Sequence, residues 1–260
     1  MSAKRAGIIA AGWGERLEQK IPKALTRVGG RALIDYTLDG LRAAGVDHVT
    51  CIINEAAQDV PPYVREHHPA LQMDWIVRTT PSSMHSFLAV LERLTQFGET
   101  SYFMTTVDSV CEPNVFASFA HDCQSFAHAD VCLGLTQFVH DEKPLRVAMA
   151  GNQGTGLMPP RIAEDPEAYA IVAMTNTGFD SEYVTAGFYQ AHPRILKEKA
   201  AALAQPFTAL RQYLGHLLKF GYQFYGVPLP PVVDVDRIQD VEMAEKFLAS
   251  GNVSSGGSRP

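Results

Sequence analysis

The feature that most constrains the fold of this chain is a regular alternation of short apolar runs with amphipathic segments. The runs at 5–11 (RAGIIAA) and 48–54 (HVTCIIN) have the length and continuous apolar character of buried strands. Between them, residues 32–45 place apolar side chains at helical spacing and end at Gly45, a residue suited to close a helix. Such alternation favours a mainly parallel sheet with helices on both faces, so the sequence predicts an α/β fold.

The same alternation continues along most of the chain. Further strands are expected at 71–77, 100–108, 130–138, 184–191 and 222–229, and further helices at 82–98, 114–128, 193–204, 206–221 and 238–250. Residues 141–180 differ, because glycines, prolines and mixed charges surround two short strand candidates at 145–150 and 169–175. We therefore predict one domain over residues 1–249, with a small inserted antiparallel lobe at about 141–180, and a disordered tail over residues 250–260.

Composition narrows the class of protein. Hydrophobic residues make up 46% of the 260 and charged residues 19%, which is ordinary for a globular protein with a sizeable core. No apolar run is long enough to span a membrane, and the first one is too short and glycine-rich for a secretory signal. The four cysteines lack metal-ligand spacing, which favours buried, reduced thiols. We expect a cytoplasmic protein with no membrane partner.

The charge is unevenly distributed. The net charge of −6 argues against a nucleic-acid partner. Residues 1–31 nevertheless hold seven Lys or Arg and two Glu, a local balance of +5 that leaves −11 for the rest. A small cationic region on an acidic body favours a small anionic ligand, and a solvated charged face is the alternative.

The cationic region contains a glycine-rich loop, AGWGERLEQKIPKAL, at residues 11–25. Gly12 and Gly14 follow directly on the first predicted strand, and without a Cβ they let the backbone approach a ligand closely. Exposed N–H groups in such a turn suit phosphate oxygens. The loop is not a P-loop, because Gly-Lys-Ser/Thr is absent, and not a dinucleotide fingerprint, because position 17 is Leu.

Gly12-x-Gly14-x-Arg16-Leu17, followed by Pro22-Lys23-x-Leu25, resembles the N-terminal loop of the nucleotidyltransferases that make activated sugars and related compounds. The resemblance is close over residues 1–55. It implies a three-layer α/β/α Rossmann-like nucleotidyltransferase fold, with a mixed but mainly parallel sheet. It also implies that the loop holds the base and triphosphate, while Arg16 and Lys23 bind phosphates and stabilise the departing pyrophosphate. Glu15 departs from the small hydroxyl residue usual in that family.

Two acidic segments are candidates for a metal site. Asp108 ends a predicted strand, where ligands of open α/β sheets bind, although it could instead cap the next turn. Asp234 and Asp236 alternate on an extended segment, so both point the same way, with a solvent-facing pair as the alternative. The resemblance implies that Asp108 ligates Mg²⁺ and that Asp236, with or without Asp234, completes the site. Asp240 is expected in the first turn of the following helix, where its charge suits the dipole.

The resemblance also assigns binding residues. It implies Arg16, Lys23 and Asp108 as catalytic residues. The implied nucleotide-binding set is Ala10, Ala11, Gly12, Trp13, Gly14, Glu15, Arg16, Lys23, Thr80, Ser82 and Ser83. On the acceptor side, Gly187 matches the segment near the sugar. The family's Glu-Lys-Pro segment is missing from GLMPPRIAEDPEAYA at 156–170, where Arg161 and the preceding Lys143-Pro144 are loose substitutes.

The function implied is Mg²⁺-dependent transfer of NMP from an NTP to a phosphorylated acceptor, with release of pyrophosphate. A sugar 1-phosphate, giving an NDP-sugar, is the leading acceptor. Cytidylyl transfer to a small phosphoalcohol such as choline phosphate is the first alternative. A glycosyltransferase of similar fold and a catalytically idle nucleotide-binding relative are the others. The sequence is compatible with a homo-oligomer and does not identify the base.

Overall fold

The computed structural model describes residues 4–14, 17, 21–98, 100–137, 144–152, 161–176 and 181–254, with side chains described as far as residue 250. The described residues form a nine-stranded sheet. In one half, adjacent strands are parallel, in the order β5-β4-β1-β6. These strands are β1 (Arg5–Ala10), β4 (His48–Ile53), β5 (Gln72–Val77) and β6 (Tyr102–Thr106).

The other half of the sheet is mixed. β11 (Val184–Ala191) runs antiparallel to β6 on one side and to β8 (Val131–Thr136) on the other, and β12 (Phe224–Pro228) pairs parallel with β8. The expected antiparallel pair is present as β9 (Arg146–Met149) and β10 (Ile171–Thr175). β9 joins the sheet through its bridge to β11, so the pair extends the sheet at its edge.

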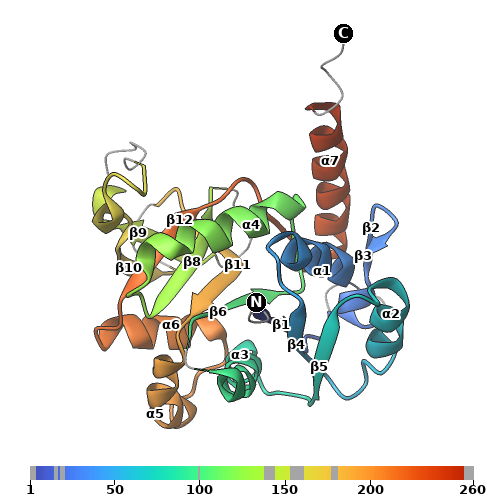
Figure 1. Cartoon of the computed structure of the whole chain (residues 1–260), viewed down its shortest axis with the longest axis horizontal. Coiled ribbons are helices and arrows are strands. Elements are labelled where there is room, and N and C mark those ends of the chain that lie inside the picture. The colour runs from blue at the N-terminus through green and yellow to red at the C-terminus, as the bar shows by residue number, and fades with distance from the viewer. Residues whose placement is uncertain are drawn as a thin grey trace.

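Helices cover both faces of the sheet (Figure 1). On one face α1 (Leu33–Ala43) packs against α4 (Pro113–Asp122), and on the other lie α3 (Ser83–Leu94) and α6 (Leu210–Lys219). The remaining helices are α2 (Val60–His67), α5 (Lys199–Leu203) and α7 (Ile238–Ser254), with 3₁₀ turns at Lys23–Leu25, Thr95–Phe97, Cys123–Phe126, Ala150–Asn152, Pro166–Tyr169 and Pro193–Glu198. The predicted α/β fold with a mixed, mainly parallel sheet is confirmed.

Two small antiparallel pairs lie outside the main sheet. β2 (Arg27–Val28) and β3 (Arg31–Ala32) form a hairpin around Gly29 and Gly30, both of which have positive φ. β7 (Ser109–Val110) pairs with β13 (Val233–Asp234), which follows it by more than 120 residues in the chain. This second pair brings the C-terminal segment to the end of β6.

Two apolar clusters hold the elements together. The larger one spans the sheet from Ile8 in β1 to Val147 in β9 and Ile171 in β10. The smaller one joins Leu17, Val28, Leu33, Tyr36, Val110, Val233, Val235 and Ala244 beneath α7. The four cysteines are buried and unpaired in the structure. No helix within the described ranges is long and apolar enough to cross a membrane.

Differences from the sequence prediction are local. α2 was not predicted, because Pro61 and Pro62 interrupt its pattern although proline is tolerated in a first helical turn. α7 continues to Ser254, five residues into the predicted tail, and residues 255–260 lie outside the described residues.

Candidate active site

Lys23 is a buried lysine, with only 6% of its surface exposed, at the start of the 3₁₀ turn Lys23–Leu25. The extended backbone of Pro22 (φ −54°, ψ 138°) leads the chain into this turn. A buried ammonium group costs free energy unless charged or polar partners surround it. The partners of Lys23 therefore define the centre of the candidate site.

Those partners are two carboxylates from distant parts of the chain. Lys23 Nζ donates to Asp108 Oδ2 and to Asp236 Oδ1, forming an ion pair with each. Asp108 follows β6, and β6 ends beside β1, with Thr106 paired to Ile9. Because the carboxyl ends of adjacent parallel strands share one edge, this pairing places Asp108 next to the segment that leaves β1.

The opposite charges of Lys23 and Asp108 shift each other's pKa values. Burial alone would lower the pKa of Lys23, but three nearby aspartates outweigh it and hold that pKa above its ordinary 10.5. In order of effect they are Asp108, Asp234 and Asp236. Burial would raise the pKa of the Asp108 carboxyl, yet the Lys23 charge keeps that pKa below its ordinary 3.8. Lys23 is therefore protonated and Asp108 ionised at neutral pH.

One carboxylate oxygen of Asp108 has no hydrogen-bond partner among the described residues. Asp108 Oδ1 is buried, and no group in the described part of the chain meets hydrogen-bond geometry with it, although nearby Thr106 also favours the charged carboxylate. A buried carboxylate oxygen without a donor is costly and suits a cation. Two carboxylates match Mg²⁺, which binds one or two of them together with substrate phosphates. Among the described residues, no three His, Cys, Asp or Glu side chains form a metal site by themselves.

The C-terminal segment is fixed in place by its backbone. Asp234 lies opposite Ser109 in the β7–β13 pair, and the N–H of Val235 donates to the Asp108 carbonyl at 3.0 Å. Asp240, in the first turn of α7 as expected, accepts from the N–H groups of Asp236 and Arg237 at 2.9 and 2.8 Å. Asp234 acts on Lys23 by charge without being one of its ion-pair partners.

The glycine loop lies against Lys23. Gly14 has φ +66°, and a Cβ there would come within 3.1 Å of Lys23 Cβ. Gly12 has open space where a side chain would be, Trp13 is half exposed, and Ala10 and Ala11 are buried at the strand end. Arg16 and Glu15 lie outside the described residues, so their predicted phosphate contacts stay predictions.

Gly187 closes the other side of the site. It has φ +75°, and a Cβ there would meet Ser109 Oγ at 2.3 Å and Thr106 Oγ1 at 2.5 Å. Only glycine fits this approach of β11 to the end of β6. Arg161 is exposed, and none of its contacts in the described ranges involves Lys23, Asp108 or Asp236. Its assignment to the acceptor stays a prediction.

The hydroxyl groups of Thr80, Ser82 and Ser83, predicted to bind the nucleotide, follow β5, and each has a protein partner. Thr80 Oγ1 lies 2.6 Å from Ser86 Oγ, and Ser82 Oγ lies 2.9 Å from His85 Nδ1. Ser83 Oγ accepts from the Leu210 N–H at 2.9 Å, which ties α3 to α6. These bonds position the loop, and nucleotide contact by its residues stays a prediction.

Sequence reasoning missed several residues around the site. Asn54, fully buried at the end of β4, donates to the Ala11 carbonyl at 3.4 Å and so supports the glycine loop; an Asn closing an apolar run was its signal. Thr106 and Ser109, 3.0 Å apart through their hydroxyls, frame Gly187. Glu142 precedes Lys143-Pro144 and completes the Glu-Lys-Pro triplet, but residues 138–143 lie outside the described residues.

Sequence comparisons identify the family and the relatives that this chain resembles. The family model of a MobA-like NTP transferase domain matches residues 6–217. CMP-5'-(3-aminopropyl)phosphonate synthase of Streptomyces rubellomurinus is 30% identical over 120 residues, which are 45% of this chain and 19% of that protein. Bifunctional protein GlmU of Clostridium perfringens is 38% identical over 55 residues, 21% of this chain and 12% of that protein. The chain spans a fifth or less of the length of these relatives.

Solved structures share the fold over nearly the whole chain. The inositol-1-phosphate CTP transferase from T. maritima superposes with a TM-score of 0.71 at 17% identity, covering 95% of this chain and 97% of that one. UDP-glucose pyrophosphorylase complexed with UDP-glucose gives 0.74 at 15% identity, covering 96% and 99%. At such identities these likenesses establish the fold alone.

Proposed function

The chain belongs to the MobA-like NTP transferase domain family, and from this premise we propose that it transfers NMP from an NTP to a phosphorylated acceptor. The observation that carries the proposal is the buried contact of Lys23 with Asp108 and Asp236, beside the glycine loop. This arrangement offers cationic and anionic groups at the strand ends where α/β enzymes bind nucleotides.

In the proposed reaction, an acceptor phosphate oxygen attacks the α-phosphorus of the NTP. A new P–O bond forms as the bond to the bridging α–β oxygen breaks, and pyrophosphate leaves with the electron pair of that bond. The protein needs no covalent nucleophile, because positioning and electrostatic stabilisation suffice. Lys23, Arg16 and the loop N–H groups hold the triphosphate and stabilise the charge on the leaving group.

A divalent metal, Mg²⁺ in our proposal, would be held by Asp108 and Asp236, with Asp234 adding negative charge nearby. Supporting this are the partnerless Oδ1 of Asp108 and the two carboxylates that already share one cation. When bound, such a metal neutralises phosphate charge and orients the triphosphate. Lys23 then faces phosphate oxygens in addition to the carboxylates.

The leading acceptor is a sugar 1-phosphate, and the product an NDP-sugar. The fold shared with UDP-glucose pyrophosphorylase supports this class of acceptor. Gly187 lets β11 approach the end of β6 closely on the proposed acceptor side, where Arg161 would bind the acceptor phosphate. A cytoplasmic location, where NTP is available and thiols stay reduced, belongs to this proposal.

The second candidate is cytidylyl transfer to a small phosphoalcohol or phosphonate. The similarity of 120 residues to CMP-5'-(3-aminopropyl)phosphonate synthase favours it, because that protein is named for a CMP-phosphonate product. A glycosyltransferase would release a nucleoside diphosphate instead of pyrophosphate. An idle relative would bind NTP without turnover.

The test is pyrophosphate release in Mg²⁺, with each common NTP against sugar 1-phosphates, phosphoalcohols and phosphonates. One productive pair is expected, and Asp108→Asn and Lys23→Ala should each lower its rate about a hundredfold, or ~3 kcal/mol. Lys199→Ala, which removes an outlying ion pair with Glu92, is the matched control.

Near-normal rates in either site variant, with folding checked by circular dichroism, would overturn the site assignment. NTP binding without turnover across the panel would favour the idle relative.

A further inference from the structure

One edge of the main sheet is a strand whose outer side is open. β5 lies at the end of the strand order and, among the described residues, pairs only with β4. None of its six residues is buried, whereas five of the six residues in each of β1 and β4 are. Figure 1 shows β5 beside β4 as the last strand of the parallel half. Such an edge offers a row of backbone groups to another strand.

The hydrogen bonds to β4 identify which backbone groups of β5 face outward. The N–H of Gln72 donates to the Asp47 carbonyl at 3.0 Å, and the N–H of Arg78 donates to the Ile53 carbonyl at 2.9 Å. Alternate residues of a parallel strand bond to the same neighbour, so the even-numbered residues from 72 to 78 face β4. The N–H and carbonyl groups of the odd-numbered residues therefore point away from the sheet.

β5 lacks the usual features that keep an edge strand from pairing. Natural edges are commonly protected by lysine, proline, a bulge or a covering element. The sequence of β5, QMDWIV, contains no lysine, proline or glycine, and its pairing with β4 is continuous from Gln72 to Val77. Val77 keeps 46% of its surface exposed although it is aliphatic. The strand is therefore suited to pairing at its outer side.

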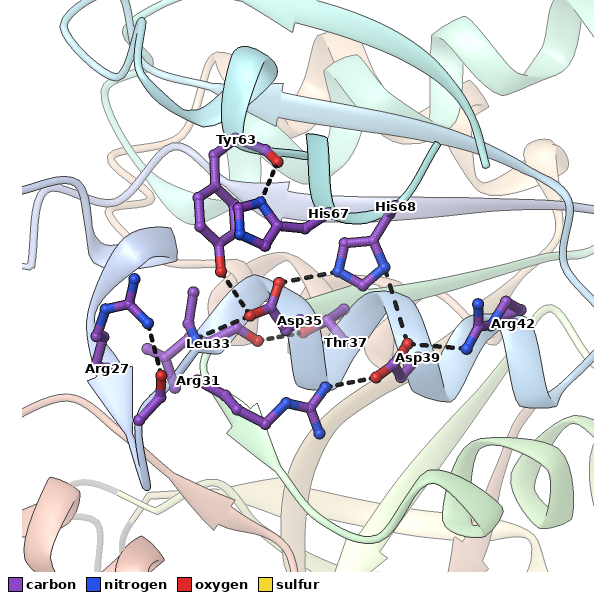
Figure 2. Close-up of polar contacts among 12 residues, drawn as sticks. Arg27, Arg31, Leu33, Asp35, Thr37, Asp39, Arg42, Tyr63, His67 and His68 are labelled. Carbon is purple, nitrogen blue, oxygen red and sulfur yellow. Dashed lines mark hydrogen bonds and ion pairs between the residues drawn. The ribbon is translucent and has the colours of Figure 1, made fainter. Parts of the chain in front are cut away.

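The helix that precedes β5 is fastened elsewhere. The Tyr63 hydroxyl of α2 donates to Asp35 Oδ2 at 2.7 Å, and His68 Nε2, just after α2, lies 2.9 Å from Asp35 Oδ1. Figure 2 shows both side chains reaching Asp35 on α1. Burial would raise the pKa of Asp35, but these bonds and one from the Ala32 N–H keep it below its ordinary 3.8. α2 is thus tied to α1, and no hydrogen bond among the described residues occupies the outward groups of β5.

The side chains of β5 complement a second copy of the same strand. Antiparallel pairing must set odd-numbered residues opposite odd-numbered residues, because these carry the outward groups. With Ile76 on the two-fold axis, Trp75 lies opposite Val77 of the second copy. Asp74 then lies opposite Arg78 of the second copy, and symmetry repeats each pair. Aromatic with β-branched pairs and pairs of opposite charge both stabilise neighbouring strands.

The charges select this register. An axis at Asp74 would place two aspartates opposite each other, and an axis at Trp75 would leave Asp74 facing an isoleucine. Arg78 is exposed and forms no ion pair in the part of the chain that the structure describes. Asp74 Oδ2 lies 3.1 Å from Arg93 Nε, and the aspartate side chain is 36% exposed. Asp74 can therefore accept a second guanidinium group through Oδ1.

We propose that two copies of this chain associate through β5, antiparallel and with Ile76 on the two-fold axis, so that their main sheets become one continuous sheet. The interface is isologous, as in most symmetric dimers. Because β1 and β4 separate β5 from β6, the carboxylate that follows β6 stays outside the interface. The association goes beyond the proposed function, since it needs neither nucleotide nor catalysis.

Sedimentation equilibrium over a hundredfold range of protein concentration, without NTP or metal, tests the proposal. The forms to compare are the unchanged chain, Val77→Lys, Arg78→Glu and Val172→Lys. Val172 is the matched control, because it lies on β10 at the opposite edge and is 49% exposed, close to the 46% of Val77. We expect a monomer–dimer equilibrium whose dissociation constant rises at least tenfold in Val77→Lys and Arg78→Glu. It should change less than twofold in Val172→Lys.

A cysteine at the axis tests the register. Ile76 and its own copy would form a non-hydrogen-bonded pair, whose Cβ atoms lie about 4.5 Å apart, close enough for a disulfide. Diamide should therefore convert Ile76→Cys into a disulfide-linked dimer on a non-reducing gel. The unchanged chain should stay monomeric on that gel, because its four cysteines are buried. Val172→Cys is the control for random collision.

Four results would overturn the proposal. An unchanged chain that stays monomeric over the whole range would show that the edge does not associate. An equal loss of association in Val172→Lys would place the interface at the other edge or reduce the effect to general charge. Association of Arg78→Glu within twofold of the unchanged chain, or cross-linking of Ile76→Cys no faster than that of Val172→Cys, would reject the pairing. Circular dichroism checks folding, and if Val77→Lys does not fold, the exposed Arg78→Glu carries the comparison.

Discussion

At the scale of single residues, Lys23 holds together two carboxylates that would otherwise repel each other. Lys23→Met removes the charge and keeps most of the side-chain volume. We expect it to lower the free energy of unfolding by about 3 kcal/mol in EDTA, because Asp108 stays buried beside Asp236 without a cation. Excess Mg²⁺ should restore part of that loss and should stabilise the variant more than the unchanged chain. Urea unfolding with EDTA or MgCl₂ measures both effects.

Lys199→Met is the control for this prediction. Lys199 forms its ion pair with Glu92 at 2.7 Å, and 32% of the lysine side chain and 57% of the glutamate side chain are exposed. An exposed pair contributes less than about 1 kcal/mol. The control should therefore lose little stability and respond to Mg²⁺ as the unchanged chain does. Equal Mg²⁺ stabilisation of Lys23→Met and the unchanged chain would show that the metal and the lysine do not share the carboxylates.

Asp35 gives a pH-dependent prediction at the same scale. Its pKa is lowered in the folded protein, so its contribution to stability is present above the ordinary value of 3.8 and disappears as the pH falls through the lower folded value. Asp35→Asn should lower the free energy of unfolding by about 2 kcal/mol at pH 7. This difference should shrink as the pH falls below about 4. Urea unfolding at several pH values measures it.

The matched control for Asp35 is Asp47→Asn. Asp47 also pairs with a histidine, His48, but in an exposed position, so solvent screens the interaction. Asp47→Asn should keep the pH profile of the unchanged chain. A difference between Asp35→Asn and the unchanged chain that stays constant from pH 7 to pH 3 would contradict the role given to the ionised carboxylate.

At the scale of elements, the contact between α1 and α4 depends on a missing side chain. A Cβ on Gly40 would lie 2.2 Å from the Phe116 ring, so the two helices can approach only where α1 carries glycine. Gly40→Ala should lower the free energy of unfolding by about 1–3 kcal/mol, because the core is forced apart. Chemical denaturation with an intrinsic fluorescence readout checks the value.

Gly215 in α6 provides the opposite case. It is also a helical glycine, but a Cβ there meets no atom within 4 Å. Gly215→Ala should therefore stabilise the protein by about 0.5–1 kcal/mol, through helix propensity alone. The same sign for both substitutions would contradict the packing argument.

At the scale of the whole molecule, the inserted strands and the parallel half of the sheet share one core. Val147 of β9 and Ile171 of β10 belong to the same apolar cluster as Ile8 of β1. We expect one cooperative thermal transition, with the calorimetric enthalpy equal to the van't Hoff enthalpy. Differential scanning calorimetry measures both. Two resolved transitions would show that the lobe at 141–180 folds separately.

Much of the fold was predictable from local pattern. Continuous apolar runs gave β1 and β11, and helical spacing with a closing glycine gave α1. α2 was missed because two prolines obscured its periodicity. The segment that forms β13 was predicted as extended, but β7 and its pairing with β13 were missed, because a two-residue strand carries no periodic signal.

The candidate site was likewise predictable from the sequence only in part. The family resemblance named Lys23 in the glycine loop and Asp108 and Asp236 in two later segments, and Arg16 and Glu15 stay predictions outside the described residues. No local pattern could indicate that Lys23 is buried against both carboxylates, that Asp108 Oδ1 lacks a partner, or that Asp240 fixes the backbone at Asp236.

The sequence by itself determined the order and type of the main elements, because hydrophobic periodicity and helix ends are properties of neighbouring residues. It also located the cationic loop. Only the tertiary structure decided which charges meet, because residues 23, 108 and 236 come together through strand pairing and the β7–β13 contact. The hollow lined by Arg27, Arg31 and Arg42 likewise exists only where α1, α2 and the β2–β3 hairpin converge.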